Sequence, residues 1–160
     1  MRRRVTIAAL ALLPAACSGT SSYSTTFNAA DHDYAHDAVM HLQADIVLLE
    51  ASPLAENPGS GERRSGQLRL MRGELAALRG LMRSTGSATP TAAESRAHVA
   101  DHPDPGLRSG MSSDELIVVT NRAAIERAVS YVPRGRQPSV VDTARRTIDD
   151  RTAVAAETVP

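Results

Sequence analysis

The sequence predicts an all-α protein built as a four-helix bundle with one long crossover. Three observations lead to this class. Four stretches have the apolar spacing of amphipathic helices, and none has the convincing alternation of a strand. The apolar residues are mostly Ala, Leu and Val with few aromatics, which suits closely packed helices. The 160 residues allow one domain with a modest core.

The first two predicted helices are separated by a short loop. The first runs from about residue 28 to residue 50, where Asn28 can cap the N-terminus and Asp31 lies near the positive end of the helix dipole. The second runs from about residue 62 to residue 84, before the stop signal Gly86. Its apolar residues alternate spacings of three and four, the seam of a packed bundle. They are Leu68, Met71, Leu75, Leu78 and Met82.

A long connection separates this pair from two further helices. Residues 85–112 have no hydrophobic period and many Pro, Gly, Ser and Thr residues, which predicts a crossover or a disordered linker. The third helix runs from residue 112 to about residue 131, with Ser112 and Glu115 at capping-box distance. The fourth runs from about residue 139 towards residue 156 and has a thin apolar stripe. We expect the bundle domain to span residues 28–158.

The N-terminus has the features of an export signal. The charged "MRRR" precedes "VTIAALALLP", which is far shorter than the roughly 20 residues that a spanning helix needs. "LPAAC" resembles the lipobox of bacterial lipoproteins, in which the cysteine becomes the lipidated first residue of the mature protein. Pro14 stands where Leu is usual, so a simple cleaved signal is the alternative.

We therefore expect residues 1–16 to be a lipoprotein signal peptide and Cys17 to be the lipid attachment site. Residues 17–27, rich in Ser and Thr, predict a flexible tether. The protein is then exported and anchored to the cell membrane or envelope on its extracytoplasmic side. The lipid anchor makes the membrane an expected partner.

Three of the five histidines lie within the first predicted helix, in "HDYAHDAVMH". At about 100° per residue, a core-facing arc consists of Ala35, Val39, Leu42, Ile46 and Leu49. His36 and His41 fall on opposite flanks of this arc, so the three histidines do not converge. A solvated polar helix face is the interpretation that this geometry favours.

The alternative is a labile surface site for copper or another divalent metal ion. Its candidate ligands are His32 with His36 on one flank, and Asp37 with His41 on the other. Each pair has the four-residue spacing that places side chains on one side of a helix. His98 and His102 have the same spacing, but they lie in the connection and form at most a weak, mobile ligand set.

Three segments in order resemble motifs of a bacterial family, the domain of unknown function 305. They are "FNAADHDYAHDAVMH", "GELAALRGLMRSTG" and "GMSSDEL", within residues 27–118. The resemblance implies an exported or lipid-anchored, ferritin-like helical domain, and some family members are associated with copper or other metal handling. The chain is then a diverged member.

The departure from the family lies in its histidines. The family's His-His pair falls on His41 and Leu42, and no histidine follows His102, so the second pair is absent. Because Leu42 points to the middle of the core arc and Glu74 lies at best on a flank, we expect an aliphatic interior without a metal site.

Charge and motifs narrow the function further. The 18 acidic and 18 basic residues balance, which argues against a nucleic-acid partner. No nucleophile elbow, metalloprotease motif or phosphate-binding loop is found, so we expect no catalytic activity. We expect an envelope protein with a structural or interaction role, and no cofactor. The alternative is a periplasmic or surface metal-binding protein; a protein partner is not identified, and self-association is left open.

Overall fold

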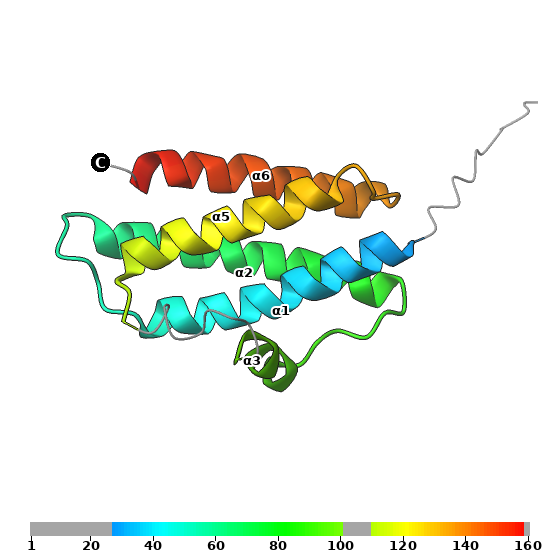
Figure 1. Cartoon of the computed structure of the whole chain (residues 1–160), viewed down its shortest axis with the longest axis horizontal. Helices are drawn as coiled ribbons and strands as arrows, with labels where there is room; N and C mark the ends of the chain where they lie inside the picture. Colours follow the sequence, from blue (N-terminus) through cyan, green and yellow to red (C-terminus); the bar gives the residue numbers. More distant parts are fainter. Residues whose placement is uncertain (1–26, 101–109, 159–160) are drawn as a thin grey trace, which may run out of the picture.

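The computed structural model describes residues 27–100 and 110–158, and the regular structure of these ranges is entirely α-helical (Figure 1). The helices are α1 (Ala29–Ala51), α2 (Ser60–Ser84), α3 (Ala92–Ala100), α5 (Ser113–Tyr131) and α6 (Pro138–Thr158). The predicted all-α class is confirmed. The expected signal peptide, Cys17 and almost all of the expected tether lie outside the described residues.

The four long helices α1, α2, α5 and α6 pack side by side into a helical bundle (Figure 1). The most extensive packing is between α1 and α2 and between α5 and α6, and a short loop joins each of these antiparallel pairs. By contrast, α2 and α5 run in the same direction, because α5 starts at the end of the bundle opposite to the end of α2. The connection between them carries α3, which lies outside the bundle against α1.

Helix α3 corrects the expectation that the connection lacks regular structure. Its start is a capping box, in which Thr91 Oγ1 accepts a hydrogen bond from Glu94 N at 3.2 Å and Glu94 Oε2 accepts one from Thr91 N at 2.7 Å. The sequence carries this signal as "TAAE". Hydrophobic periodicity misses the helix because its small and polar residues have almost no apolar face.

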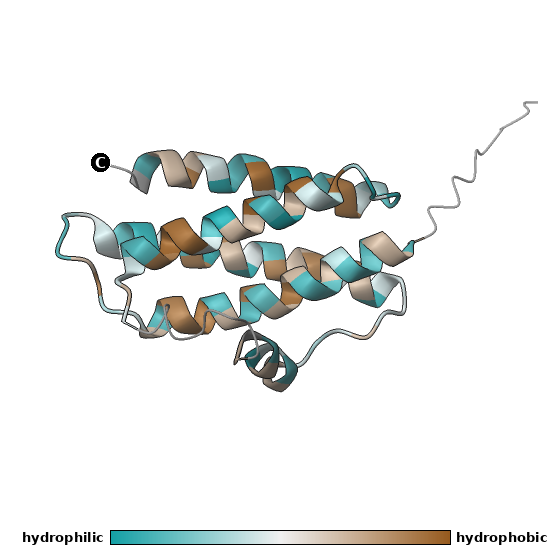
Figure 2. Cartoon of the chain, viewed as in Figure 1, coloured by the Kyte–Doolittle hydropathy of each residue, from teal (hydrophilic) through white to brown (hydrophobic). Residues whose placement is uncertain are grey.

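The hydrophobic core lies between the four long helices. The predicted arc of α1 is confirmed, because its five residues are all buried in the core cluster. From the predicted seam of α2, Met71, Leu78 and Met82 are fully buried, whereas Leu68 and Leu75 are partly buried. Figure 2 shows hydrophilic and hydrophobic residues mixed along every helix. Within the described residues, none of the helices has both the length and the apolarity of a membrane-crossing segment.

The N-terminus of α1 is fastened to the loop between α5 and α6 by the carboxylate of Asp31. Asp31 and Asn28 form a capping box, with Asp31 N to Asn28 Oδ1 at 2.8 Å and Asn28 N to Asp31 Oδ2 at 2.9 Å. The same carboxylate accepts hydrogen bonds from the Tyr131 hydroxyl, from Arg136 N at 3.0 Å and from Gln137 N at 3.1 Å. Burial raises the pKa of Asp31, but these hydrogen bonds outweigh burial and leave the pKa below its usual value.

Tyr131 itself is tightly enclosed. Its ring stacks on Tyr34 with the centroids 4.3 Å apart. On the loop side, Gly135 comes so close that a Cβ at this position would lie 2.5 Å from Tyr131 Cζ. Burial, and next the hydrogen bond to Asp31, raise the pKa of the Tyr131 hydroxyl. The hydroxyl therefore remains a donor to Asp31 at all moderate pH values.

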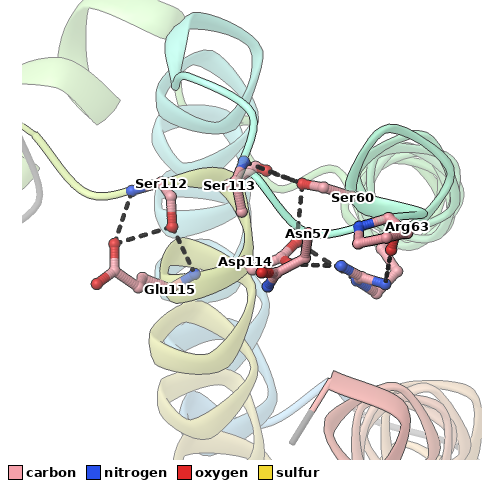
Figure 3. A network of polar contacts seen from close by, with 9 residues as sticks. Asn57, Ser60, Arg63, Ser112, Ser113, Asp114 and Glu115 are labelled. Carbon is pink, nitrogen blue, oxygen red and sulfur yellow. Dashed lines mark hydrogen bonds and ion pairs between the residues drawn. The ribbon is translucent and has the colours of Figure 1, made fainter. Parts of the chain in front are cut away.

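A second polar cluster fastens the opposite end of the bundle (Figure 3). Asp114, in the first turn of α5, accepts hydrogen bonds from Arg63 Nη2 at 2.6 Å, Ser60 Oγ at 3.1 Å and Asn57 Nδ2 at 3.3 Å. The bond from Arg63 is the main reason that the pKa of Asp114 lies below its usual value. Beside it, the predicted capping box of Ser112 with Glu115 is confirmed. This cluster joins the α1–α2 loop and the start of α2 to the start of α5.

The interior is not purely aliphatic, which corrects the expectation for Glu74. Its carboxylate is buried between α2 and α6, where Oε2 accepts a hydrogen bond from Arg151 Nη2 at 2.6 Å and Oε1 accepts one from Thr147 Oγ1 at 2.7 Å. Arg151 is only 1% exposed, and its Nη1 also donates to Asn121 Oδ1 at 3.0 Å. Leu42 points into the core as predicted, but a buried ion pair lies in the same bundle.

The Asp31 fastening predicts how stability depends on pH. At pH 7 we expect Asp31→Asn to lower the free energy of unfolding by about 1–3 kcal/mol, because buried donors lose their charged acceptor. Because the folded-state pKa of Asp31 is lowered, its contribution is present above its unfolded-state pKa of about 3.9 and is lost as the pH falls through the lower folded-state value. Urea unfolding followed by circular dichroism should therefore show the gap between wild type and variant narrowing below about pH 4. Asp33→Asn, at an exposed position of the same helix, should change little at either pH; equal effects of the two variants would contradict the prediction.

The Glu74–Arg151 pair predicts a strongly non-additive pair of substitutions. Arg151→Met leaves the Glu74 carboxylate buried without its cation, and we expect a loss of about 3–5 kcal/mol in the free energy of unfolding. Adding Glu74→Gln should restore part of that loss, because the uncompensated charge is removed. Arg122→Met, which breaks an exposed ion pair with Glu126, is the matched control and should cost far less. Additive effects of the first two substitutions in urea unfolding would refute a direct interaction.

Candidate metal centre

Helix α3 covers one flank of α1 and so brings the imidazole of His98 next to that of His41. Asp37 and His41 are one turn apart on α1, and α3 packs mainly against this helix (Figure 1). Gln43 Nε2 donates to the carbonyl of Pro90 at 3.1 Å, which fixes the start of the α3 segment. The imidazole of His98, in the last turn of α3, then lies against Asp37 and His41.

Three ligand atoms from these residues form a nearly equilateral triangle. Nε2 of His41 and Nε2 of His98 are 3.4 Å apart. Oδ1 of Asp37 is 3.6 Å from the first nitrogen and 3.5 Å from the second. Asp37, His41 and His98 are the group of metal-ligand side chains that the described residues bring together. Residues 57 positions apart in sequence thus place their coordinating atoms at one point.

The triangle is buried on one side and accessible on the other. The His41 side chain is 8% exposed, whereas His98 and Asp37 are 29% and 38% exposed. On the Asp37 side, a groove of about 270 Å³ between α1 and α5 reaches the carboxylate. An ion could therefore approach from solvent, and the buried imidazole would form the floor of the site.

Arg127 on α5 orients the carboxylate of Asp37. Arg127 Nε lies 3.7 Å from Asp37 Oδ2, the oxygen that does not belong to the triangle. Its charge thus engages one carboxylate oxygen and leaves Oδ1 directed at the two imidazoles. Second-shell contacts of this kind hold a ligand in position and tune its affinity for a metal.

In the structure, the four candidate ligands predicted from the sequence lie in two separate groups. Asp37 and His41 lie together in the triangle, whereas His32 and His36 stack on each other, with ring centroids 5.8 Å apart. His32 is exposed and lies 3.8 Å from Asp33. Among the described residues, this stacked pair does not join a third carboxylate or imidazole in a cluster of three mutually close ligand atoms.

The expectation of a solvated face is wrong for His41, because α3 covers it. The sequence pairs His98 only with His102, in a weak, mobile ligand set, because the connection shows no hydrophobic period that would place His98 on a helix against α1. The capping signal at Thr91 and Glu94, followed by His98 four residues later, is the pattern that could have placed it on a helix. His102 lies outside the described residues.

The arrangement suits coordination more than acid–base chemistry. The two imidazole nitrogens and one carboxylate oxygen are ligands typical of Zn²⁺, Cu²⁺ and related divalent ions. Three protein ligands leave at least one coordination position for water or another donor. No family model, curated protein or solved structure was found to match the chain. The resemblance to the domain of unknown function 305 therefore stays a prediction from its three motifs.

Proposed function

We propose that this protein binds a divalent metal ion reversibly through Asp37, His41 and His98. The observation that carries the proposal is the size of the triangle. The centre of a triangle with edges of 3.4–3.6 Å lies about 2.0 Å from each corner, close to the distances of about 2.0–2.2 Å that zinc keeps from imidazole nitrogen and carboxylate oxygen. An ion could thus be held without rearranging the helices.

The ligand types favour Zn²⁺ or Cu²⁺ over other common ions. Imidazole suits these borderline ions, whereas Mg²⁺ and Ca²⁺ prefer sites made of oxygen atoms alone. Because the site has three protein ligands and an accessible side, we infer exchange of the ion instead of permanent structural retention. The role that we propose is binding of the ion.

We further propose that the metal-binding domain is exported and lipid-anchored through Cys17. The support is the charged start, the short apolar stretch and "LPAAC" in the sequence. The domain would then meet metal ions in the extracytoplasmic space. The helix order and the parallel α2 and α5 support a ferritin-like four-helix bundle with one crossover, as a diverged relative of the family named above.

The proposed site predicts which histidines matter for metal affinity. Isothermal titration of the full-length chain carrying Cys17→Ser, which removes its only thiol, should give one zinc or copper(II) ion per chain. His98→Ala and Asp37→Asn should each weaken binding by more than about 100-fold, because losing a ligand costs more than the 10–100-fold typical of losing a second-shell partner.

The matched control is His36→Ala, which removes a histidine from the same helix outside the triangle and should leave the affinity unchanged within about twofold. Equal losses in His36→Ala and His98→Ala would show generic surface binding and would reject the site. Absence of binding would leave the structural or interaction role in the envelope as the better proposal.

The proposed anchor predicts a change in fractionation. In a bacterial host, Cys17→Ser should move the protein from the membrane fraction to the soluble or unprocessed pool, because no thioether-linked lipid can form. Ser18→Ala, at the neighbouring position, should remain in the membrane fraction. Immunoblotting of the separated fractions measures the distribution of both variants. An unchanged distribution of Cys17→Ser would reject the lipid anchor. The titration described above tests the metal site independently.

A further inference from the structure

The side chains of α3 that the structure describes contribute polar contacts to the bundle and no part of its hydrophobic core. Ala92, Ala93, Arg96 and Ala97 face solvent, and among the described side chains of the helix Ser95 is buried. A nine-residue helix is marginal by itself, so α3 depends on its contacts with α1 to remain helical.

Side-chain contacts at both ends of the α3 segment connect it to α1. At its start, Gln43 Nε2 donates to Pro90 O. At its end, His98 contacts His41 and Asp37. Segments with little buried apolar area open at low free-energy cost. A modest change in the energy of the contact between His98 and α1 can therefore shift the equilibrium between docked and open α3.

We propose that α3 is a metal-operated latch, an inference that rests on the proposed metal site. An ion shared by Asp37, His41 and His98 cross-links α3 to α1, because one ligand comes from α3 and two come from α1. Opening α3 removes His98 from the ion, so the docked form binds metal more tightly than the open form. By linkage, metal binding stabilises docking to the same extent that docking strengthens metal binding.

The consequence is that metal status controls the exposure of a flank of α1. With metal, α3 covers His41 and holds Ser95 inside. When metal leaves, α3 opens more readily, and in the open form the buried imidazole of His41 becomes accessible to solvent and to a fresh ion. The latch thus couples release of the ion to opening of the connection between α2 and α5.

Hydrogen exchange of the full-length Cys17→Ser protein, followed by mass spectrometry, tests this coupling. With zinc at about 100 times its dissociation constant, the amides of residues 92–100 should exchange about 100-fold more slowly than in the metal-free protein. Amides in the middle of α6 should not respond, and they serve as the internal control. His98→Ala should abolish the zinc effect on α3, whereas His36→Ala should retain it.

A second variant probes the latch without touching a ligand. Gln43→Ala removes the hydrogen bond to Pro90 and so favours the open form. It should speed exchange in metal-free α3 by up to about fivefold, the equivalent of one net hydrogen bond of ~1 kcal/mol, and should weaken zinc binding by less than this. Failure of zinc to bind at all refutes the proposed function and the latch together. Tight binding that depends on His98, with no change in α3 exchange, would refute the latch alone and leave the metal site standing.

Discussion

The hydrogen bonds accepted by the Asp31 carboxylate determine how α1 sits in the bundle. Asp31 caps its own helix and, at the same time, receives donors from α5 and from the loop that follows it. Because side-chain directions along a continuous helix are set by the helical period, fixing this first turn fixes all later ones. Leu42 then points inward, and Asp37 and His41 point to the flank where α3 docks. The directions of Asp37 and His41 in the proposed metal site are thus set by contacts made less than two helical turns earlier in α1.

Polar contacts stabilise the bundle at both of its ends and in its interior. Asp31 and Asp114 fasten its opposite ends, and Glu74 with Arg151 joins α2 to α6 in the interior. In bundles that carry di-metal sites, inward-facing carboxylates are neutralised by metal ions. Here a guanidinium from α6 neutralises the inward-facing carboxylate instead. The three ligand side chains that converge lie instead on a flank of α1, where Asp37 and His98 are partly exposed.

The sequence predicts well those features that one helix determines alone. As capping residues, Asn28 and Ser112 indicate where α1 and α5 begin. The spacing of Val39, Leu42 and Ile46 identifies the core face of α1. Features that need a second element are missed. The burial of His41 depends on α3, and the burial of Glu74 depends on Arg151, which is 77 residues away. A helical projection considers one helix without its neighbours. It therefore cannot distinguish a flank that is exposed to solvent from a flank that a distant segment of the chain covers.

The position of α3 in the connection, outside the four packed helices, has an evolutionary consequence. Its described side chains make no part of the core, so substitutions there meet little selection for packing. The third ligand can accordingly be gained, lost or replaced by drift in a surface segment while the scaffold remains intact. The proposed metal affinity would then change independently of the bundle, through the residue at position 98.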